Sequence, residues 1–174
     1  MAALQPTLRD ARLTGRRVHL RPLAPGDAAV AFDLVHSREE ILRWLLWSGP
    51  QSVQDMEEWC ESWAMPGPDG WNYHFAICEA AGTGEFLGTI GPRFSGHPFL
   101  GDLGYWLAER AWGRGLMTEA VFLCAHLCFR HLGSRALTAE VFDGNVGSER
   151  VLERNGFRRE ETPHECRLPD GGRI

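Results

Sequence analysis

The stretch Arg110-Ala-Trp-Gly113-Arg-Gly115-Leu-Met-Thr118-Glu decides how the rest of the chain is interpreted. It follows a strand-like run, residues 102–107, and opens a long apolar helical segment, residues 116–131. Two glycines between a strand and a helix let the backbone approach a ligand closely, because no Cβ stands in the way. The unpaired N–H groups of a helix N-terminus suit an anion such as a pyrophosphate. Taken alone, however, two such glycines are equally typical of a tight turn.

Three motifs, in order along the chain, carry a family resemblance. Arg110-x-x-Gly113-x-Gly115 matches the Arg/Gln-x-x-Gly-x-Gly/Ala acetyl-CoA loop of the GNAT superfamily of N-acetyltransferases. Asn145-Val-Gly-Ser148, followed by Val151-Leu-Glu-Arg-Asn-Gly156-Phe157, resembles the RimJ/RimL-like branch of ribosomal-protein N-acetyltransferases. The run Val18-His-Leu-Arg21-Pro-Leu is similar to the first strand of that branch. The resemblance spans roughly residues 16–160.

The resemblance implies an acetyl-CoA site around the glycine loop. Arg110 and Arg114 would add two cations at its mouth. The backbone of Leu107 would hydrogen-bond the pantetheine arm, and a backbone N–H near Trp106–Leu107 would meet the thioester carbonyl. Asn145 would bind the same arm. The full set of expected cofactor-binding residues is Leu107, Arg110, Trp112, Gly113, Arg114, Gly115, Met117, Thr118 and Asn145.

The resemblance also implies a proton donor for the acetyl transfer, whereas the family has no invariant general base. Many GNAT enzymes protonate the leaving thiolate with a tyrosine, but the corresponding position here is Leu152, which cannot donate a proton. The RimJ/RimL-like branch has Asn-x-x-Ser, so Ser148 is the expected donor near the sulfur. Capping of a helix start explains Asn145 and Ser148 equally well without any cofactor. For the general base we expect Asp102, with Glu140 as an alternative.

Two further side-chain clusters have competing interpretations. Five tryptophans fall on what the family uses as the acceptor side, and only Trp47, beside the Gly49-Pro50 break, is expected to line the acceptor site. Cys124 and Cys128 with the neighbouring histidines suggest a metal only superficially, since core packing explains a helical cysteine pair and no metal is expected.

Composition limits the function classes. Lysine and arginine number 18 against 23 aspartates and glutamates, a net charge of −5, so neither nucleic acid nor an anionic membrane is an expected partner. The five cysteines are odd in number and lack the spacing of a disulfide framework. No leader and no apolar run long enough to span a bilayer is present, so a cytoplasmic enzyme is expected.

The pattern along the chain predicts one α/β domain over residues 1–174, with residues 1–15 loosely held. Strands are expected near residues 16–23, 73–78, 86–90, 102–107 and 137–142, and helices near 27–36, 41–47, 52–63, 116–131 and 145–155. A loop at 66–70 and a turn at 96–98 interrupt them. This order predicts a mixed, mostly antiparallel twisted sheet with helices on both faces. The helix at 116–131 is apolar nearly all round and is expected to be buried.

The end of the chain departs from the family pattern. The family closes its acceptor side with a final hairpin, and this sequence stops just after Asp170-Gly171-Gly172, where the last strand would begin. An open strand edge invites pairing with a second chain, so a homodimer is expected.

Function follows as a set of alternatives. The leading interpretation is direct acetyl transfer from acetyl-CoA to a primary amine, on a protein N-terminus, an amino acid, an aminoglycoside or a polyamine. A non-catalytic acyl-CoA-binding or regulatory module would retain the same loop. A phosphate-binding nucleotide site is disfavoured, because the sequence has no Gly-Lys-Ser/Thr loop.

Overall fold

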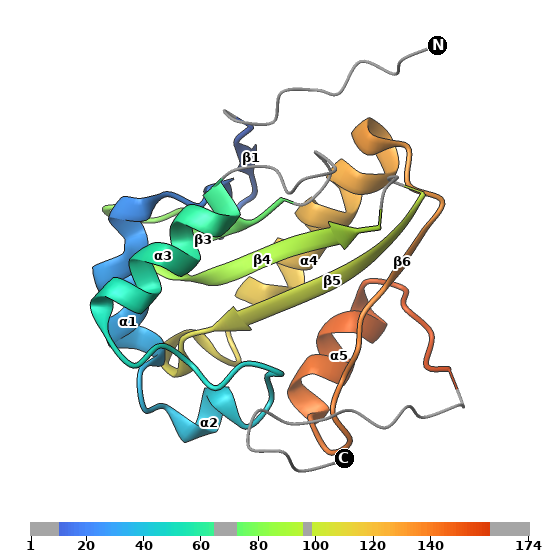
Figure 1. Cartoon of the computed structure of the whole chain (residues 1–174). Coiled ribbons are helices and arrows are strands. Elements are labelled where there is room, and N and C mark those ends of the chain that lie inside the picture. Colours follow the sequence, from blue (N-terminus) through green and yellow to red (C-terminus); the bar gives the residue numbers. More distant parts are fainter. Residues whose placement is uncertain (1–10, 65–72, 96–98, 161–174) are drawn as a thin grey trace.

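The computed structural model describes residues 11–64, 73–95 and 99–160 of the chain (Figure 1). The loop expected at 66–70, the turn expected at 96–98 and the open edge expected beyond residue 160 lie outside the described residues.

Six strands form a single sheet in the order β1-β2-β3-β4-β5-β6. Their bounds are Leu13–Thr14, Val18–Pro22, Phe75–Glu79, Phe86–Phe94, Leu100–Leu107 and Ala136–Thr138. Neighbouring strands are antiparallel except for β5 and β6, which are parallel. The predicted mixed, mostly antiparallel sheet is therefore confirmed.

Helices cover both faces of this sheet. On one face lie α1, α2 and α3, and α4 crosses the other face (Figure 1). The bounds are Ala28–Val35 for α1, Glu39–Leu42 for α2, Val53–Ala64 for α3, Leu116–Leu127 for α4 and Val146–Arg154 for α5. A π-helical turn, η4 (Cys128–Leu132), extends α4. Over residues 11–64, 73–95 and 99–160, no helix is long and apolar enough to cross a bilayer.

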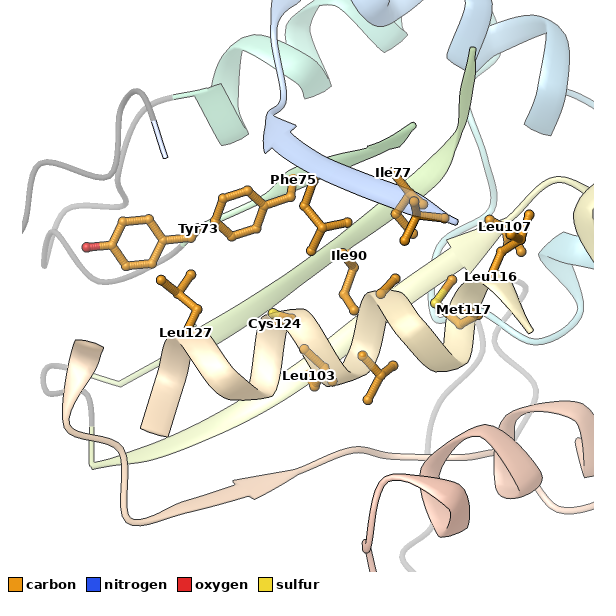
Figure 2. Packing of buried hydrophobic residues seen from close by; sticks show 14 of the residues in the cluster. Tyr73, Phe75, Ile77, Ile90, Leu103, Leu107, Leu116, Met117, Cys124 and Leu127 are labelled. Atoms are coloured by element: carbon orange, nitrogen blue, oxygen red, sulfur yellow. The ribbon is translucent and has the colours of Figure 1, made fainter. Parts of the chain in front are cut away.

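Two hydrophobic cores follow from this layering. Figure 2 shows the first, where side chains of β3, β4 and β5 such as Phe75, Ile90 and Leu103 pack onto α4. The second lies between the opposite face and α1–α3, and it includes Met56, Cys60 and Trp106. Because side chains alternate between the faces of a strand, neighbouring residues of β5 serve different cores. Tyr105 contacts the α4 core and Trp106 the α1–α3 core.

The helix ends agree with the sequence prediction. Ser52 Oγ accepts the N–H of Asp55, and the Asp55 carboxylate accepts the N–H of Ser52, both at 3.1 Å. At the end of α5, Gly156 has a φ of 82°. The N–H of Phe157 reaches the Leu152 carbonyl at 3.1 Å. This is the predicted Schellman stop.

Two predicted elements are shorter than expected. The helix predicted at 41–47 is wrong after residue 42, because the chain continues with three-residue turns such as Trp44 N–H to Ile41 carbonyl and leaves Leu46 exposed. The strand predicted at 137–142 is paired only over 136–138. Alternation predicts an extended backbone there but does not supply a partner strand.

The segment at 116–131 is expected to be buried except for a thin exposed line through Glu119, His126 and Arg130, but the exposed side of the helix is wider than that. One face is buried, with Ala120 and Cys124 fully covered, whereas Phe122 remains 59% exposed and Phe129, in η4, 46% exposed. An apolar composition is compatible with burial on every side of a helix. Here the sheet covers only one side of α4. Cys124 and Cys128 are both buried in the core, as the packing interpretation predicts, and His126 is exposed.

Glu119 ties the first strands to α4. Its carboxylate accepts the backbone N–H groups of Arg16, Arg17 and Val18 at 2.9, 2.7 and 2.9 Å. Burial alone would raise the pKa of Glu119, but these three donors outweigh it and hold the pKa below 4.5. A Cβ on Gly15 would lie 2.8 Å from the Glu119 carboxyl carbon, so the glycine makes room for this contact.

We expect Glu119→Gln to lower the free energy of unfolding by about 2 kcal/mol at neutral pH, because hydrogen bonds to a charged acceptor are lost. A depressed folded-state pKa stabilises the protein above the unfolded pKa, near 4.5, and this contribution disappears as the pH falls through the folded pKa. Urea unfolding across this acid range is the measurement. Glu58→Gln, at an exposed residue of α3, is the control and should change little. A difference between wild type and Glu119→Gln that persists at the lowest pH would contradict the assignment.

Candidate active site

The glycine loop joins β5 to α4 through two left-handed residues. After the short turn η3 (Glu109–Ala111), Gly113 and Gly115 have φ values of 71° and 72°. L-residues with a side chain rarely adopt this conformation, which explains both glycines. A Cβ on Gly113 would meet nothing within 4 Å, whereas one on Gly115 would lie 2.6 Å from the Arg17 guanidinium. The loop therefore presents open space beside its backbone at Gly113.

The first turn of α4 offers backbone donors. Gly115 is the N-cap and has no side chain to accept a hydrogen bond, and the N–H of Glu119 is the first to bond back, to the Gly115 carbonyl at 3.2 Å. Within the described part of the chain, the N–H groups of Leu116, Met117 and Thr118 have no acceptor and could bind a ligand. The Met117 side chain is buried in the α4 core (Figure 2), so only its backbone is available.

The arginines of the loop are already paired. Arg110 forms an ion pair with Glu85 at 2.6 Å, and Arg114 forms one with Glu79. Both acids belong to the β3–β4 hairpin, so the two cations predicted at the mouth are directed toward it. The sequence does not predict a third cation at the loop, Arg17. Its guanidinium donates to the Arg114 carbonyl at 3.0 Å, although the two residues are 97 positions apart. No local pattern predicts such a contact.

Among residues 11–64, 73–95 and 99–160, no strand pairs with the outer edge of β5 near the loop. The N–H of Ala108, just past β5, bonds to the carbonyl of Leu87 in β4. Because such bonds alternate along an antiparallel pair, the backbone polar groups of Leu103, Tyr105 and Leu107 point away from β4. They face the side of β6, which pairs only with Leu100–Asp102. In the described part of the chain, the Leu107 carbonyl is reached by the Trp112 indole N–H, at 2.7 Å. Trp112 thus closes the loop onto the strand end.

Helix α5 brings Ser148 to this edge. Asn145 is the N-cap, and its side-chain oxygen accepts the Ser148 N–H at 3.2 Å, as the capping interpretation predicts. The Ser148 hydroxyl lies 2.7 Å from the Tyr105 hydroxyl. Farther along α5, Asn155 donates to the Thr118 carbonyl at 3.1 Å and so connects α5 to the first turn of α4.

Tyr105 is the residue that sequence reasoning missed. A tyrosine in a strand that precedes a buried helix is typical of a core side chain, and part of Tyr105 does pack on the α4 core. Its hydroxyl nevertheless meets Ser148, 43 residues away. Burial raises the pKa of Tyr105 above 10.0, although the hydrogen bond to Ser148 acts in the opposite direction. The phenol is therefore protonated at neutral pH.

Asp102 lies apart from this group. It shares the α1–α3 face with Trp106 and forms an ion pair with Arg93 of β4. Asp102 lies four positions before Trp106, a distance of about 13 Å along β5. Its predicted role as general base stays a prediction, and at that distance it would act through water. Glu140, the alternative, is exposed beyond β6.

An aromatic cluster occupies the α1–α3 face. The Trp47 and Trp59 rings are stacked at 5.2 Å, and the His74 ring meets Trp59 edge-on at 5.2 Å. Burial, reinforced by the nearby Arg93 charge, lowers the pKa of His74 to about 3, so the imidazole is neutral. Within the described part of the chain, His74 Nδ1 and Trp106 Nε1 are buried without a hydrogen-bond partner. Trp47 is half-buried at the border of this cluster.

Comparison with known proteins decides the family. The sequence model of the Acetyltransferase (GNAT) domain matches residues 17–158. This chain belongs to the GNAT acetyltransferases. The matched family is the RimJ/RimL-like one, which confirms the resemblance found in the motifs.

Individual GNAT relatives cover most or half of the chain. YkkB of Bacillus subtilis is 28% identical over 160 residues, which cover 91% of each chain. YjcK of the same organism, named as a probable N-acetyltransferase, is 37% identical over 90 residues, covering 51% of this chain and 49% of its own. The structure of Mycobacterium smegmatis RimJ in complex with CoA-disulfide has a TM-score of 0.72 at 24% identity, covering 86% and 73% of the two chains.

A GNAT domain implies an acyl-CoA cosubstrate, and the loop fits one. Its left-handed glycines leave the space beside Gly113 open, and three backbone N–H groups at the start of α4 are without intrahelical partners. This combination suits the pyrophosphate of CoA, because the N-terminal end of a helix carries partial positive charge.

We expect Gly113→Val to weaken CoA binding about tenfold or more while the fold is retained, because a branched side chain would occupy the open space and strain a φ of 71°. Isothermal titration with CoA measures the effect. Gly82→Val is a matched control, since Gly82 has the same φ of 71° and equally empty surroundings in the β3–β4 hairpin. It should cost similar stability and leave CoA affinity unchanged. Wild-type CoA affinity in Gly113→Val, or the same loss of affinity in both variants, would disprove the loop assignment.

Proposed function

We propose that this GNAT enzyme transfers the acetyl group of acetyl-CoA directly to a primary amine. The observation that carries the proposal is the edge of β5 over residues 103–107, which has no partner strand among the described residues and lies between the glycine loop and the Tyr105–Ser148 pair. A chain of amide groups such as the pantetheine arm can bond along such an edge as an added strand would. The acceptor remains open between a protein N-terminus, an amino acid, an aminoglycoside and a polyamine.

Each end of the cosubstrate has a counterpart on the chain. The pyrophosphate would bind the N–H groups of Gly113, Gly115, Met117 and Thr118, with the loop shape set by Trp112. Because the Leu107 carbonyl is taken by the Trp112 indole, Leu107 would offer its backbone N–H to the thioester end of the pantetheine arm, and the side chain of Asn145 would hold the arm itself. The Asn145 oxygen serves the helix cap, so its amide N–H₂ group is the part that would face the ligand. Arg110 and Arg114 would contribute only by exchanging their hairpin carboxylates for phosphate.

The two faces of β5 support separate roles for thiol and amine. Tyr105 and Ser148 lie on the α4 and α5 side, while Trp106 belongs to the α1–α3 face that also carries Trp47. A thioester lying along the edge would thus meet Ser148 from one face and the amine from the other. The acceptor would lie beside Trp47, and Asp102 on that face would receive its proton through water.

The chemistry requires few groups. The amine nitrogen forms a bond to the thioester carbon, the C–S bond breaks and the electron pair leaves with sulfur. The nitrogen loses a proton to a base or water, and the sulfur regains one. Positioning of the amine supplies much of the rate. The Leu107 backbone N–H would bond the oxyanion, and the Ser148 hydroxyl would donate a hydrogen bond to the leaving sulfur, which then takes its proton from solvent.

Incubation with acetyl-CoA and a panel of primary amines, with mass detection of products, tests this function. We expect an acetylated product and free CoA in equal amounts from at least one amine class. The panel should contain one peptide N-terminus, one free amino acid, one aminoglycoside and one polyamine. Saturable CoA binding without any product would contradict the proposal and favour the non-catalytic acyl-CoA-binding module.

Ser148→Ala separates catalysis from capping. The cap is formed by the Asn145 side chain and the Ser148 backbone N–H, which alanine retains, so helix α5 should stay intact. We expect kcat to fall by about 10²-fold, with the KM for acetyl-CoA little changed, because an interaction made only in the transition state is removed. The melting temperature should drop by only about 2–4 °C, for one lost hydrogen bond. Steady-state kinetics and a melting curve on the same preparation decide. Wild-type kcat with a lower melting temperature would leave Ser148 a structural residue.

A further inference from the structure

Tyr105 enters neither the family motifs nor the expected site, yet its hydroxyl contacts the expected proton donor. The distance between its oxygen and Ser148 Oγ is 2.7 Å, a good hydrogen bond for two hydroxyl groups. Within the described residues, the Ser148 hydroxyl has no other partner. The geometry alone leaves open which of the two oxygens donates.

Acidity decides the direction of this hydrogen bond. A phenol is a stronger acid than an aliphatic alcohol, so Tyr105 is the better donor and Ser148 the better acceptor. With its lone pair occupied by the phenolic hydrogen, the Ser148 hydroxyl directs its own hydrogen away from Tyr105. Its backbone is held from the other side by the Asn145 cap at 3.2 Å. Ser148 is therefore anchored at two points with one hydrogen left to donate.

We propose that Tyr105 is a positioning residue that orients the Ser148 hydroxyl toward the sulfur of CoA and strengthens its hydrogen bond to the thiolate. The inference rests on the proposed function. Tyr105 itself undergoes no covalent change: the C–S electron pair stays on sulfur, Ser148 donates a hydrogen bond to it, and solvent supplies the final proton. Because hydrogen bonds in a chain polarise one another, the phenol makes Ser148 a better donor than it would be alone.

A purely structural role is the competing explanation. The same hydrogen bond connects β5 to α5, and its loss would destabilise the protein without affecting the sulfur. The test therefore needs a readout at the sulfur itself. The thiol of bound CoA provides one, because any group that stabilises the thiolate lowers the pKa of that thiol, and the ultraviolet absorbance of the thiolate reports it without any amine.

The experiment compares wild type, Tyr105→Phe, Ser148→Ala and the double variant, each saturated with CoA and titrated with base. We expect wild type to lower the thiol pKa relative to free CoA, Tyr105→Phe to remove about half of that shift, and Ser148→Ala to remove all of it. The double variant should match Ser148→Ala, because Tyr105 acts only through Ser148. In turnover, Tyr105→Phe should lower kcat about tenfold with unchanged KM for acetyl-CoA.

Tyr73→Phe is the matched control. Tyr73 belongs to the same α4 core but lies at the Leu127 end of the helix, whereas Leu107 lies at the Leu116–Met117 end (Figure 2). The control should cost stability without changing the thiol pKa or kcat. A wild-type thiol shift and kcat in Tyr105→Phe would overturn the inference, as would losses that multiply in the double variant. The expected thiol shifts without any acetylated amine would support the inference while refuting the proposed function.

Discussion

The site depends on one asymmetry of strand β5. On one side it is bonded to β4 from Gly101 to Leu107, and on the other it is bonded to β6 over only its first three residues. Buried or half-buried backbone groups without partners are costly, so a strand edge left open inside a fold needs something to complete it. In the described part of the chain, the backbone of Leu103 and Tyr105 and the N–H of Leu107 form such an edge. The glycine loop and helix α5 lie beside it.

Several long-range contacts fix the elements on either side of this strand edge. The Trp112 indole bonds the Leu107 carbonyl at the loop end, and Asn155 connects α5 to the start of α4. The Tyr105–Ser148 hydrogen bond joins β5 directly to α5. Glu119 fixes α4 to the first strands through three backbone donors, so the helix N-terminus cannot shift relative to the sheet without losing them. Together these contacts hold a helix start and a strand edge in one fixed relation.

Local features of the site were predictable from sequence, and long-range ones were not. A left-handed backbone demands glycine at Gly113 and Gly115, and a helix start demands a cap such as Asn145, so both left a signature within a few residues. The Tyr105–Ser148 contact spans 43 residues and the Arg17–Arg114 contact 97. Such contacts depend on tertiary packing.

The failed element predictions have the same origin. Alternation in residues 137–142 predicts an extended backbone. Whether such a segment becomes a strand depends on a partner, and the pairing of β6 with β5 ends at Thr138. The apolar composition of α4 likewise does not reveal that the sheet covers only one side of it, leaving Phe122 in solvent. In both cases the segment's own residues permit more structure or burial than the neighbouring elements provide.

The pairing of the loop arginines changes how anion recognition is best understood here. Arg110 and Arg114 each contact a glutamate of the β3–β4 hairpin, so much of their charge is compensated before any ligand arrives. Exposed ion pairs of this kind contribute little energy and exchange readily, and a phosphate can replace the carboxylate at small net gain. The helix N-terminus has no such competitor, because its N–H groups have no acceptor in the described part of the chain. Recognition of the pyrophosphate would therefore depend mainly on backbone geometry, which makes the two left-handed glycines more important to the loop than its two arginines.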